Sequence, residues 1–283
     1  MPSMQDRNNS GFTLIEMLII APVVILAIGA FIATIIYMTG DAVATRAQNT
    51  MAYDVQDALD RIEQDVRLSG AFLAQSNLAS ITAPQGSSDD TQRFQSVDTG
   101  GSRLILNAFA TSENPSSASR TPIYLINSPH ACTSSDIAQN QVMTFNIVYF
   151  IKETDGVSSL WRRTMMPSNY TSAGCSGQVP WQQPSCSEGA TATFCRTTDV
   201  RVLDDITYAG LQIRYYNSAQ TTTENTNASS QNLSTRQSAL TNVDTIQITL
   251  SPSAVAGGRD ISHSGTLRAT RIGAYNDRVT PLP

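Results

Sequence analysis

Charged side chains are scarce in this sequence, and lysine is almost missing. Asp, Glu, Lys and Arg together make up 14% of the 283 residues, the formal net charge is -5, and Lys152 is the single lysine. A protein that binds along a nucleic-acid backbone needs many Lys and Arg side chains facing the phosphates. The composition therefore excludes a broadly basic surface of that kind.

One local arginine pair is the remaining candidate for phosphate contact. Arg162 and Arg163 follow Trp161, so an aromatic ring and two cations stand together. Two arginines supply only a small part of a phosphate-binding footprint. We expect Trp161 to anchor a core and the arginines to alternate around a strand, and we predict no nucleic-acid partner.

Histidine is the second scarcity. Only two histidines are present, His130 and His263, so a Ser-His-Asp or Cys-His site would need one of them beside a nucleophile. The cysteines lack the C-x2-C spacing typical of structural zinc. The carboxylate pairs at residues 89–90 and 204–205 could touch calcium, but turns are the better interpretation. We predict no enzymatic activity, no cofactor and no metal site.

Charge is missing altogether from one long stretch. Residues 17–40 carry no charged side chain, and about 20 apolar residues in a helix cross the hydrocarbon core of a bilayer. A spanning helix is the first interpretation. A cleaved secretory signal ending at Ala44 is the alternative, because residues 42–44 read AVA. The apolar run is longer than the 7–15 residues usual for such a signal.

Glu16 stands at the entrance to this apolar run. A charged group near the centre of a membrane helix costs about 2.5–3.5 kcal/mol on insertion scales, so this carboxylate calls for a cation. Proteolysis between Gly11 and Phe12 would free an amine four residues earlier, which could pair with Glu16 of a neighbouring subunit. The alternative is a headgroup position, where Glu16 would favour the helix N-terminal dipole.

Residues 11–16, GFTLIE, followed by the apolar run, resemble the N-terminal signal of type IV pilins and type II secretion pseudopilins. The resemblance implies that residues 1–11 form a leader, that a prepilin peptidase cuts after Gly11, and that the amine of Phe12 is methylated. It also implies that Glu16 aligns subunits in a filament. The leader contains one basic residue, Arg7, and one acidic residue, Asp6. It therefore lacks the excess of basic residues that marks the cytoplasmic side of a membrane helix.

Pro22 is a departure from the family pattern, because it comes earlier than the proline common in major pilins. Proline removes the hydrogen bond to the carbonyl of Leu18 and clashes with that turn. We therefore expect the helix to kink or melt locally at Pro22.

The helical pattern continues beyond the apolar run of residues 12–40. Over residues 41–72 the apolar positions step by three or four, as in one face of a helix: Ala44, Ala47, Met51, Val55, Leu59, Ile62 and Val66. Asp57 with Arg61 and Glu63 with Arg67 have the favourable i,i+4 order on the other face. A helix from Phe12 to about Leu68 would be on the order of 85 Å long, which points to assembly.

After residue 72 the sequence shows strand patterns in place of the helical pattern, and residues 73–283 are expected to form a β-rich domain. Strand-like runs begin near residues 103, 122, 142, 160, 211, 245 and 265, and several alternate apolar and polar residues. Residues 74–102 are predicted to be a surface excursion, and residues 217–238 a flexible polar loop. Helix first and strands afterwards predicts an α+β fold.

The order of these strands extends the resemblance to PilW-type minor pilins and to the J-type minor pseudopilins. It implies a pilin-like fold, with the long helix packed on an antiparallel sheet. The expected function is that of a minor pilin in pilus assembly, or of a minor pseudopilin. The expected partners are other pilins, the prepilin peptidase, the assembly platform and motor, and the inner membrane. The chain would cross that membrane once and later reach the pilus at the cell surface. A membrane-anchored extracytoplasmic enzyme or binding module is the distant alternative.

Four cysteines lie in the second half: Cys132, Cys175, Cys186 and Cys195. If this domain is exported, we expect two disulfides, and closing a loop of 10–15 residues contributes about 3 kcal/mol. Three pairings are possible. The short span rich in Gly and Pro favours Cys175 with Cys186, which leaves Cys132 with Cys195.

Overall fold

The structure is a computed structural model that describes residues 14–78, 93–98, 101–126, 132–133, 141–190, 193–217 and 222–271. In these ranges one long helix precedes a series of mostly antiparallel strands, so the predicted α+β class is confirmed. The chain divides into two compact units. The first comprises Met1–Asn49 and Val255–Ile261, and the second comprises Thr50–Ala254 and Ser262–Pro283.

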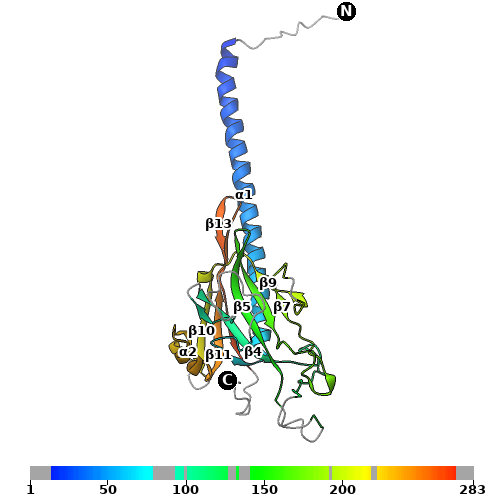
Figure 1. Cartoon of the computed structure of the whole chain (residues 1–283). Helices are drawn as coiled ribbons and strands as arrows, with labels where there is room; N and C mark the ends of the chain where they lie inside the picture. The colour runs from blue at the N-terminus through cyan, green and yellow to red at the C-terminus, as the bar shows by residue number, and fades with distance from the viewer. Residues whose placement is uncertain are drawn as a thin grey trace, which may run out of the picture. The chain divides into compact units, whose positions relative to one another are not determined.

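The long helix, α1, spans Leu14–Arg67 and is drawn from blue to cyan in Figure 1. Its 54 residues correspond to about 80 Å at 1.5 Å per residue. The helix continues through Pro22 without local melting, and a bend of the axis there stays a prediction. The most apolar window of α1 has a mean hydropathy of 2.8 and no residue buried by the rest of the chain. By length and composition α1 can therefore cross a membrane.

The second half of α1 carries the predicted apolar stripe. In the second unit its buried members line the core: Val55, Ala58, Leu59, Ile62 and Val66. Glu63 and Arg67 form the predicted ion pair at 2.5 Å. The helix ends at Arg67, and the Ser69 hydroxyl donates to the carbonyl of Val66. The predicted end of the helix near Leu68 is therefore confirmed.

The larger sheet has five antiparallel strands in the order β1-β4-β5-β6-β9. Their bounds are β1 Ser69–Phe72, β4 Leu104–Phe109, β5 Thr144–Thr154, β6 Val157–Met165 and β9 Val200–Leu203. The β5–β6 turn places Asp155 and Gly156 at φ of 54° and 79°, a left-handed pair suited to a two-residue hairpin. This sheet and the α1 stripe belong to one buried cluster.

A smaller sheet has three antiparallel strands in the order β10-β11-β14. Their bounds are β10 Leu211–Asn217, β11 Val243–Leu250 and β14 Gly265–Thr270. Ile213 pairs with Ile248, which pairs in turn with Leu267. The alternation predicted for β10 is observed, because Leu211, Ile213 and Tyr215 are buried while Gln212 and Arg214 are exposed.

Short elements fill the connections. Two-residue strands pair as β2 Val97–Asp98 with β3 Gly101–Ser102, and as β7 Ser185–Cys186 with β8 Thr197–Thr198. The 3-10 turns are η2 Cys175–Gly177, η3 Tyr208–Gly210 and η4 Thr226–Ser229. The strands β12 Ser253–Ala256 and β13 Arg259–Ser262 form a separate two-stranded sheet.

The first unit contains the tip of this last hairpin together with the first part of α1. Gly257 and Gly258 form the turn at φ of 59° and 75°. A Cβ atom on Gly40 would lie 2.9 Å from the carbonyl oxygen of Gly257, so the two backbones touch. Arg259 donates to the carboxylate of Asp41 at 2.5 Å, and its guanidinium lies 4.8 Å from the ring centre of Tyr37. The tip thus binds α1 at the first charge after the apolar run.

Three sequence-based expectations for loops and strands were wrong. The predicted strand near residue 122 is only a set of isolated bridges, including Thr111 with Pro122 and Tyr124 with Val142. The predicted loop 217–238 contains η4 and most of a short helix, α2, at Leu233–Leu240. The excursion 74–102 buries Phe94 in a second core cluster with Phe150. Residues 79–92, 99–100 and 218–221 lie outside the described residues.

The helix α2 is held by a local cap and by the contacts of one buried arginine. The side chain of Asn232 caps it by accepting from the amide of Thr235 at 3.0 Å. The fully buried Arg236 donates to the carbonyl of Ser230 at 2.6 Å and to the side chain of Gln95 at 3.1 Å. The polar composition of residues 217–238 predicted a flexible loop. The cap and the contacts of Arg236 nevertheless hold part of this segment in a helix.

Candidate functional site

The predicted N-terminal site falls largely outside the described residues, since Gly11 and Phe12 precede them. Glu16 lies in the first turn of α1 and is exposed. An acidic side chain there is favoured by the helix dipole. Its predicted role in aligning subunits stays a prediction, as do the cleavage after Gly11 and the methylation of Phe12.

The first half of α1 presents large apolar side chains all around its circumference. These residues are exposed within the chain: Leu14, Ile15, Met17, Leu18, Ile19, Ile20, Val23, Val24, Ile25, Leu26, Ile28, Phe31, Ile32, Ile35, Ile36, Tyr37 and Met38. A helix that packs on one domain needs only a single apolar stripe, whereas an apolar circumference suits lipid or several surrounding helices. This surface is the most extensive candidate site in the described chain.

The four cysteines form two disulfides, as expected, but the favoured pairing was wrong. Cys132 is bonded to Cys175, and Cys186 to Cys195, with Cα–Cα distances of 5.5 and 5.7 Å. The amide of Cys175 donates to the carbonyl of Tyr124 at 2.7 Å, which ties Cys175 to the segment leading to Cys132.

A second local contact explains the other disulfide. Cys186 lies in β7, which pairs in parallel with β8, where Cys186 stands opposite Thr198. This pairing folds the chain back and brings Cys195 to Cys186. Spacing alone could not reveal a two-residue parallel ladder.

Arg162 contributes to a polar cluster between β6 and the end of α1. Its Nε and Nη2 atoms donate to the two oxygens of Asp65 at 2.6 and 3.1 Å. The hydroxyl of Tyr149 donates to the same carboxylate at 2.5 Å. Burial and then the charge of Asp65 hold the pKa of Tyr149 well above its usual range. The cluster therefore fastens α1 to the sheet.

Arg163 points into the protein on the other face of β6. It donates to Asp199 through Nη2 at 2.6 Å, and its side chain is only 1% exposed. Its guanidinium carbon lies 5.7 Å from the ring centre of Phe94 and 5.5 Å from that of Phe150. Both arginines of the pair thus meet carboxylates, and they alternate around the strand as predicted.

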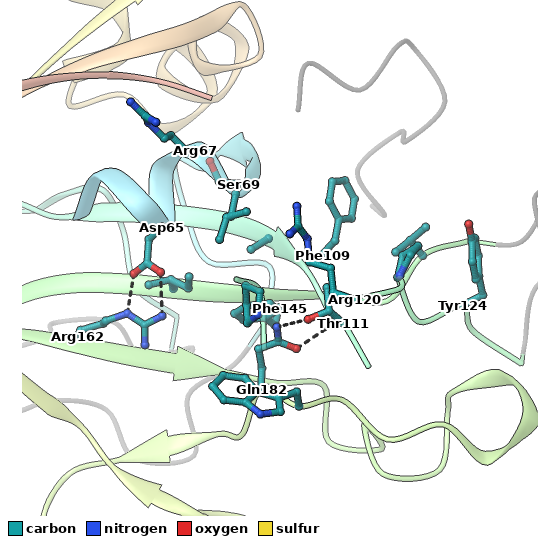
Figure 2. A pocket seen from close by; sticks show the side chains of 17 residues that line it. Asp65, Arg67, Ser69, Phe109, Thr111, Arg120, Tyr124, Phe145, Arg162 and Gln182 are labelled. Carbon is teal, nitrogen blue, oxygen red and sulfur yellow. Dashed lines mark hydrogen bonds and ion pairs between the residues drawn. The ribbon is translucent and has the colours of Figure 1, made fainter. Parts of the chain in front are cut away.

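A cavity of about 490 Å³ opens where the end of α1 meets the larger sheet. Figure 2 shows the Asp65–Arg162 pair toward one end and Tyr124 toward the other, with the Thr111–Gln182 contact between them. Its size lies in the ordinary range for small-molecule sites. The described lining residues come from five segments: residues 65–69, 108–124, 142–147, Arg162 and residues 181–182. No pattern in the sequence predicted this cavity.

The cavity could not be predicted from sequence patterns, because its walls come from segments far apart in the chain. Trp181 follows Pro180 in a stretch without strand or helix pattern, and Arg120 lies in another such stretch, just before the strand-like run that contains Tyr124. The hydrogen bonds from Gln182 to Thr111 join the two stretches: the amide of Thr111 donates to Gln182 at 3.0 Å, and Gln182 donates back at 2.7 Å.

The residues weighed for metal binding do not converge in the described ranges. No group of three or more His, Cys, Asp or Glu side chains there is arranged around a cation position. Asp204 accepts from Ser159 at 2.8 Å and lies 3.2 Å from Arg201, while Asp205 has a φ of 56°, as in a turn. His263 is half-buried, and both His130 and the pair at 89–90 lie outside the described residues.

Comparison with known proteins adds no assignment. No protein-family model, curated protein or solved structure matches this chain.

Proposed function

We propose that this chain is a structural subunit of a type IV pilus, a minor pilin of the PilW kind. The observation that carries the proposal is the apolar circumference of α1 between Leu14 and Met38, whose large side chains are exposed within the chain. This surface begins within the GFTLIE motif, residues 11–16, and continues beyond it. The function is mechanical, and no chemical step is assigned to the chain.

The apolar circumference needs a surrounding that excludes water at every stage. Before assembly the bilayer supplies it, since residues 17–40 carry no charge and suffice to span the hydrocarbon. During assembly neighbouring helices replace the lipid, so the apolar surface never faces water. An assembly motor would drive this exchange by drawing the helix out of the membrane.

Glu16 supplies register in this scheme. Cleavage after Gly11 makes Phe12 the first residue, and its amine can pair with Glu16 of the neighbouring subunit. In apolar surroundings a charge without a counter-charge is strongly disfavoured. A subunit displaced along the filament by one helical turn would leave both charges unpaired, so the pair selects one position.

The two disulfides support an exported location for the C-terminal domain, because disulfides persist in oxidising compartments outside the cytoplasm. The topology proposed is a single pass through the inner membrane with the β-rich domain on the outer side. After assembly the domain would lie on the pilus at the cell surface. The partners proposed are other pilins, the prepilin peptidase, and the platform and motor of pilus assembly.

A minor pseudopilin of the J type is the second candidate, because it shares the N-terminal signal and the order of strands. Deletion of the gene separates the two. Loss of surface pili with normal secretion of exported enzymes supports the pilin, and the reverse supports the pseudopilin.

The decisive experiment is mass spectrometry of the mature N-terminus. We expect a chain that begins at a methylated Phe12. Gly11→Glu should leave the full-length chain in the membrane, whereas Asn8→Glu, which adds the same charge to the leader, should be processed normally. A mature chain that begins at Thr45 would exclude the filament function, because it would lack the apolar helix.

A further inference from the structure

We propose that the cavity beside the end of α1 binds a small aromatic anion, such as an aromatic carboxylate. The inference concerns only the second unit and does not depend on the filament function. It rests on the aromatic walls of the cavity, on the state of its carboxylate, and on three hydrogen-bond donors at its edge.

The walls suit a flat apolar body. Four aromatic residues line the cavity, and these are Phe109, Tyr124, Phe145 and Trp181. Trp181 is 53% exposed although it is a large aromatic, and its amide is held by the carbonyl of Thr111 at 2.9 Å. Aromatic faces bind planar apolar groups through offset and edge contacts. A fixed, half-exposed indole at the edge of a cavity is therefore a suitable stacking surface.

Most polar groups in the walls are already used inside the protein. Asp65, the only carboxylate among the described lining residues, accepts from Arg162 and Tyr149. The side chains of Thr111 and Gln182 bond to one another, and the Ser69 hydroxyl donates to Val66. A ligand rich in hydroxyl groups, such as a sugar, would find few free partners here. This pattern favours a mainly apolar ligand.

Three donors at the cavity remain available. In the described part of the chain the hydroxyl of Tyr124 and the indole N–H of Trp181 make no hydrogen bond. Arg120 has no carboxylate partner there and donates only to the carbonyl of Ser117, at 3.2 Å. All three can donate, and Arg120 adds a positive charge. Their natural counterpart is a group that accepts hydrogen bonds and carries a negative charge.

The two other arginines in the lining are each paired with a carboxylate. Arg67 is paired with Glu63 at 2.5 Å, and Arg162 with Asp65 at 2.6 Å. Arg120 is thus the lining cation that no described carboxylate neutralises. One aromatic body and one negative charge complete the description of the ligand.

The test uses the full-length chain in lipid nanodiscs and the probe 6-fluoro-2-naphthoate, followed by fluorine NMR line broadening. Its uncharged twin, 6-fluoro-2-naphthamide, measures the contribution of charge, and empty nanodiscs measure uptake by lipid. We expect saturable binding of the naphthoate above the empty-disc background, and weaker binding of the amide.

Two variants assign the binding to the cavity. Arg120→Gln should weaken naphthoate binding about tenfold, because a hydrogen bond to a charged group is lost, and should change amide binding little. Trp181→Ala should weaken both probes. Arg214→Gln and Val179→Ala are the matched controls, since both residues are exposed and neither lines the cavity.

Three results would overturn the proposal. The first is no naphthoate binding beyond that of empty discs. The second is binding that neither Arg120→Gln nor Trp181→Ala changes, which would place the probe elsewhere. The third is an equal loss of naphthoate and amide in Arg120→Gln, which would assign Arg120 a structural role and remove the preference for an anion.

Discussion

Arg163 and Asp199 form an ion pair in the interior of the second unit, with 2.6 Å between Nη2 and the carboxylate and side chains that are 1% and 3% exposed. The hydroxyl of Ser185 donates to the same carboxylate at 2.9 Å, and that of Ser187 accepts from Arg163 at 2.8 Å. The pair joins β6 to the segment that carries the Cys186–Cys195 disulfide.

Breaking this pair should cost far more than replacing it. Asp199→Asn leaves Arg163 without its counter-charge, and we expect a loss of about 3–5 kcal/mol in the free energy of unfolding. The double variant Arg163→Met/Asp199→Leu should recover most of that loss, because no charge is then buried. Urea unfolding followed by tryptophan fluorescence measures both. Equal stability of the single and double variants would contradict this account.

The contact between Gly40 and Gly257 should be sensitive to one methyl group. Alanine at Gly257 would collide with the backbone of Gly40, whereas alanine at Gly258 meets nothing within 4 Å. Both positions have positive φ, so both substitutions carry backbone strain of about 1–2 kcal/mol. Hydrogen exchange of residues 253–262 should therefore rise more in Gly257→Ala than in Gly258→Ala. A similar rise of hydrogen exchange in both variants would show that the contact with Gly40 contributes no stability of its own.

High pH should destabilise the second unit through its buried tyrosines. Burial holds the pKa of Tyr149 and of Tyr215 above the usual value of 10.0. Above pH 10 the unfolded chain loses these protons while the folded chain keeps them, so stability present below pH 10 falls as the pH rises. For one tyrosine, the free energy of unfolding falls by at most about 1.4 kcal/mol for each pH unit.

Tyr149→Phe is the matched test of that slope. The variant lacks one titrating group and should lose stability less steeply than the wild type between pH 10 and 11, whatever its stability at pH 8. Urea unfolding at each pH gives the slopes. Identical slopes would mean that Tyr149 ionises alike in the folded and unfolded chains.

The two disulfides should differ in their contribution to stability. Cys132 and Cys175 are 43 positions apart, and Cys186 and Cys195 are nine apart. Loop entropy then gives about 4 kcal/mol for the longer loop and about 2.6 kcal/mol for the shorter. Replacing both cysteines of a pair by serine should lower the urea midpoint more for the longer loop. Non-reducing peptide mapping checks the pairing itself.

Glu16 should matter for assembly and not for insertion. Glu16→Gln removes the charge and nearly keeps the shape, so membrane insertion should be unchanged or slightly easier. Incorporation into sheared filaments should fall, because the amine of Phe12 loses its partner. Thr13→Ala, a neutral change in the same motif, is the control. Wild-type incorporation of the Glu16 variant would remove the proposed pairing.

Periodic features were predictable from the sequence, and this includes most of the fold. The stripe through Val55, Leu59 and Ile62 and the alternation along β10 follow from helical and strand periods, and each lies where the period placed it. Burying an apolar face determines these elements locally, so nearby residues carry enough information.

Features that depend on long-range pairing could not be predicted. Arg236 fixes a helix in a segment of polar composition through Gln95, 141 positions away. The cysteine pairing depends on the ladder between β7 and β8, and the cavity is lined both by the end of α1 and by Trp181, more than 100 positions later. The N-terminal motif is different again, because its expected roles come from a resemblance, and Gly11 and Phe12 lie outside the described residues.

The ion pair between Asp41 and Arg259 can form only late in synthesis, because its partners are 218 positions apart in the chain. A ribosome adds about 5–20 residues per second, so roughly 10–40 s separate the synthesis of Asp41 from that of Arg259. Throughout this interval α1 exists without the hairpin that later covers Gly40. Lipid or another protein that binds this stretch of α1 during synthesis can therefore reach it before the hairpin exists.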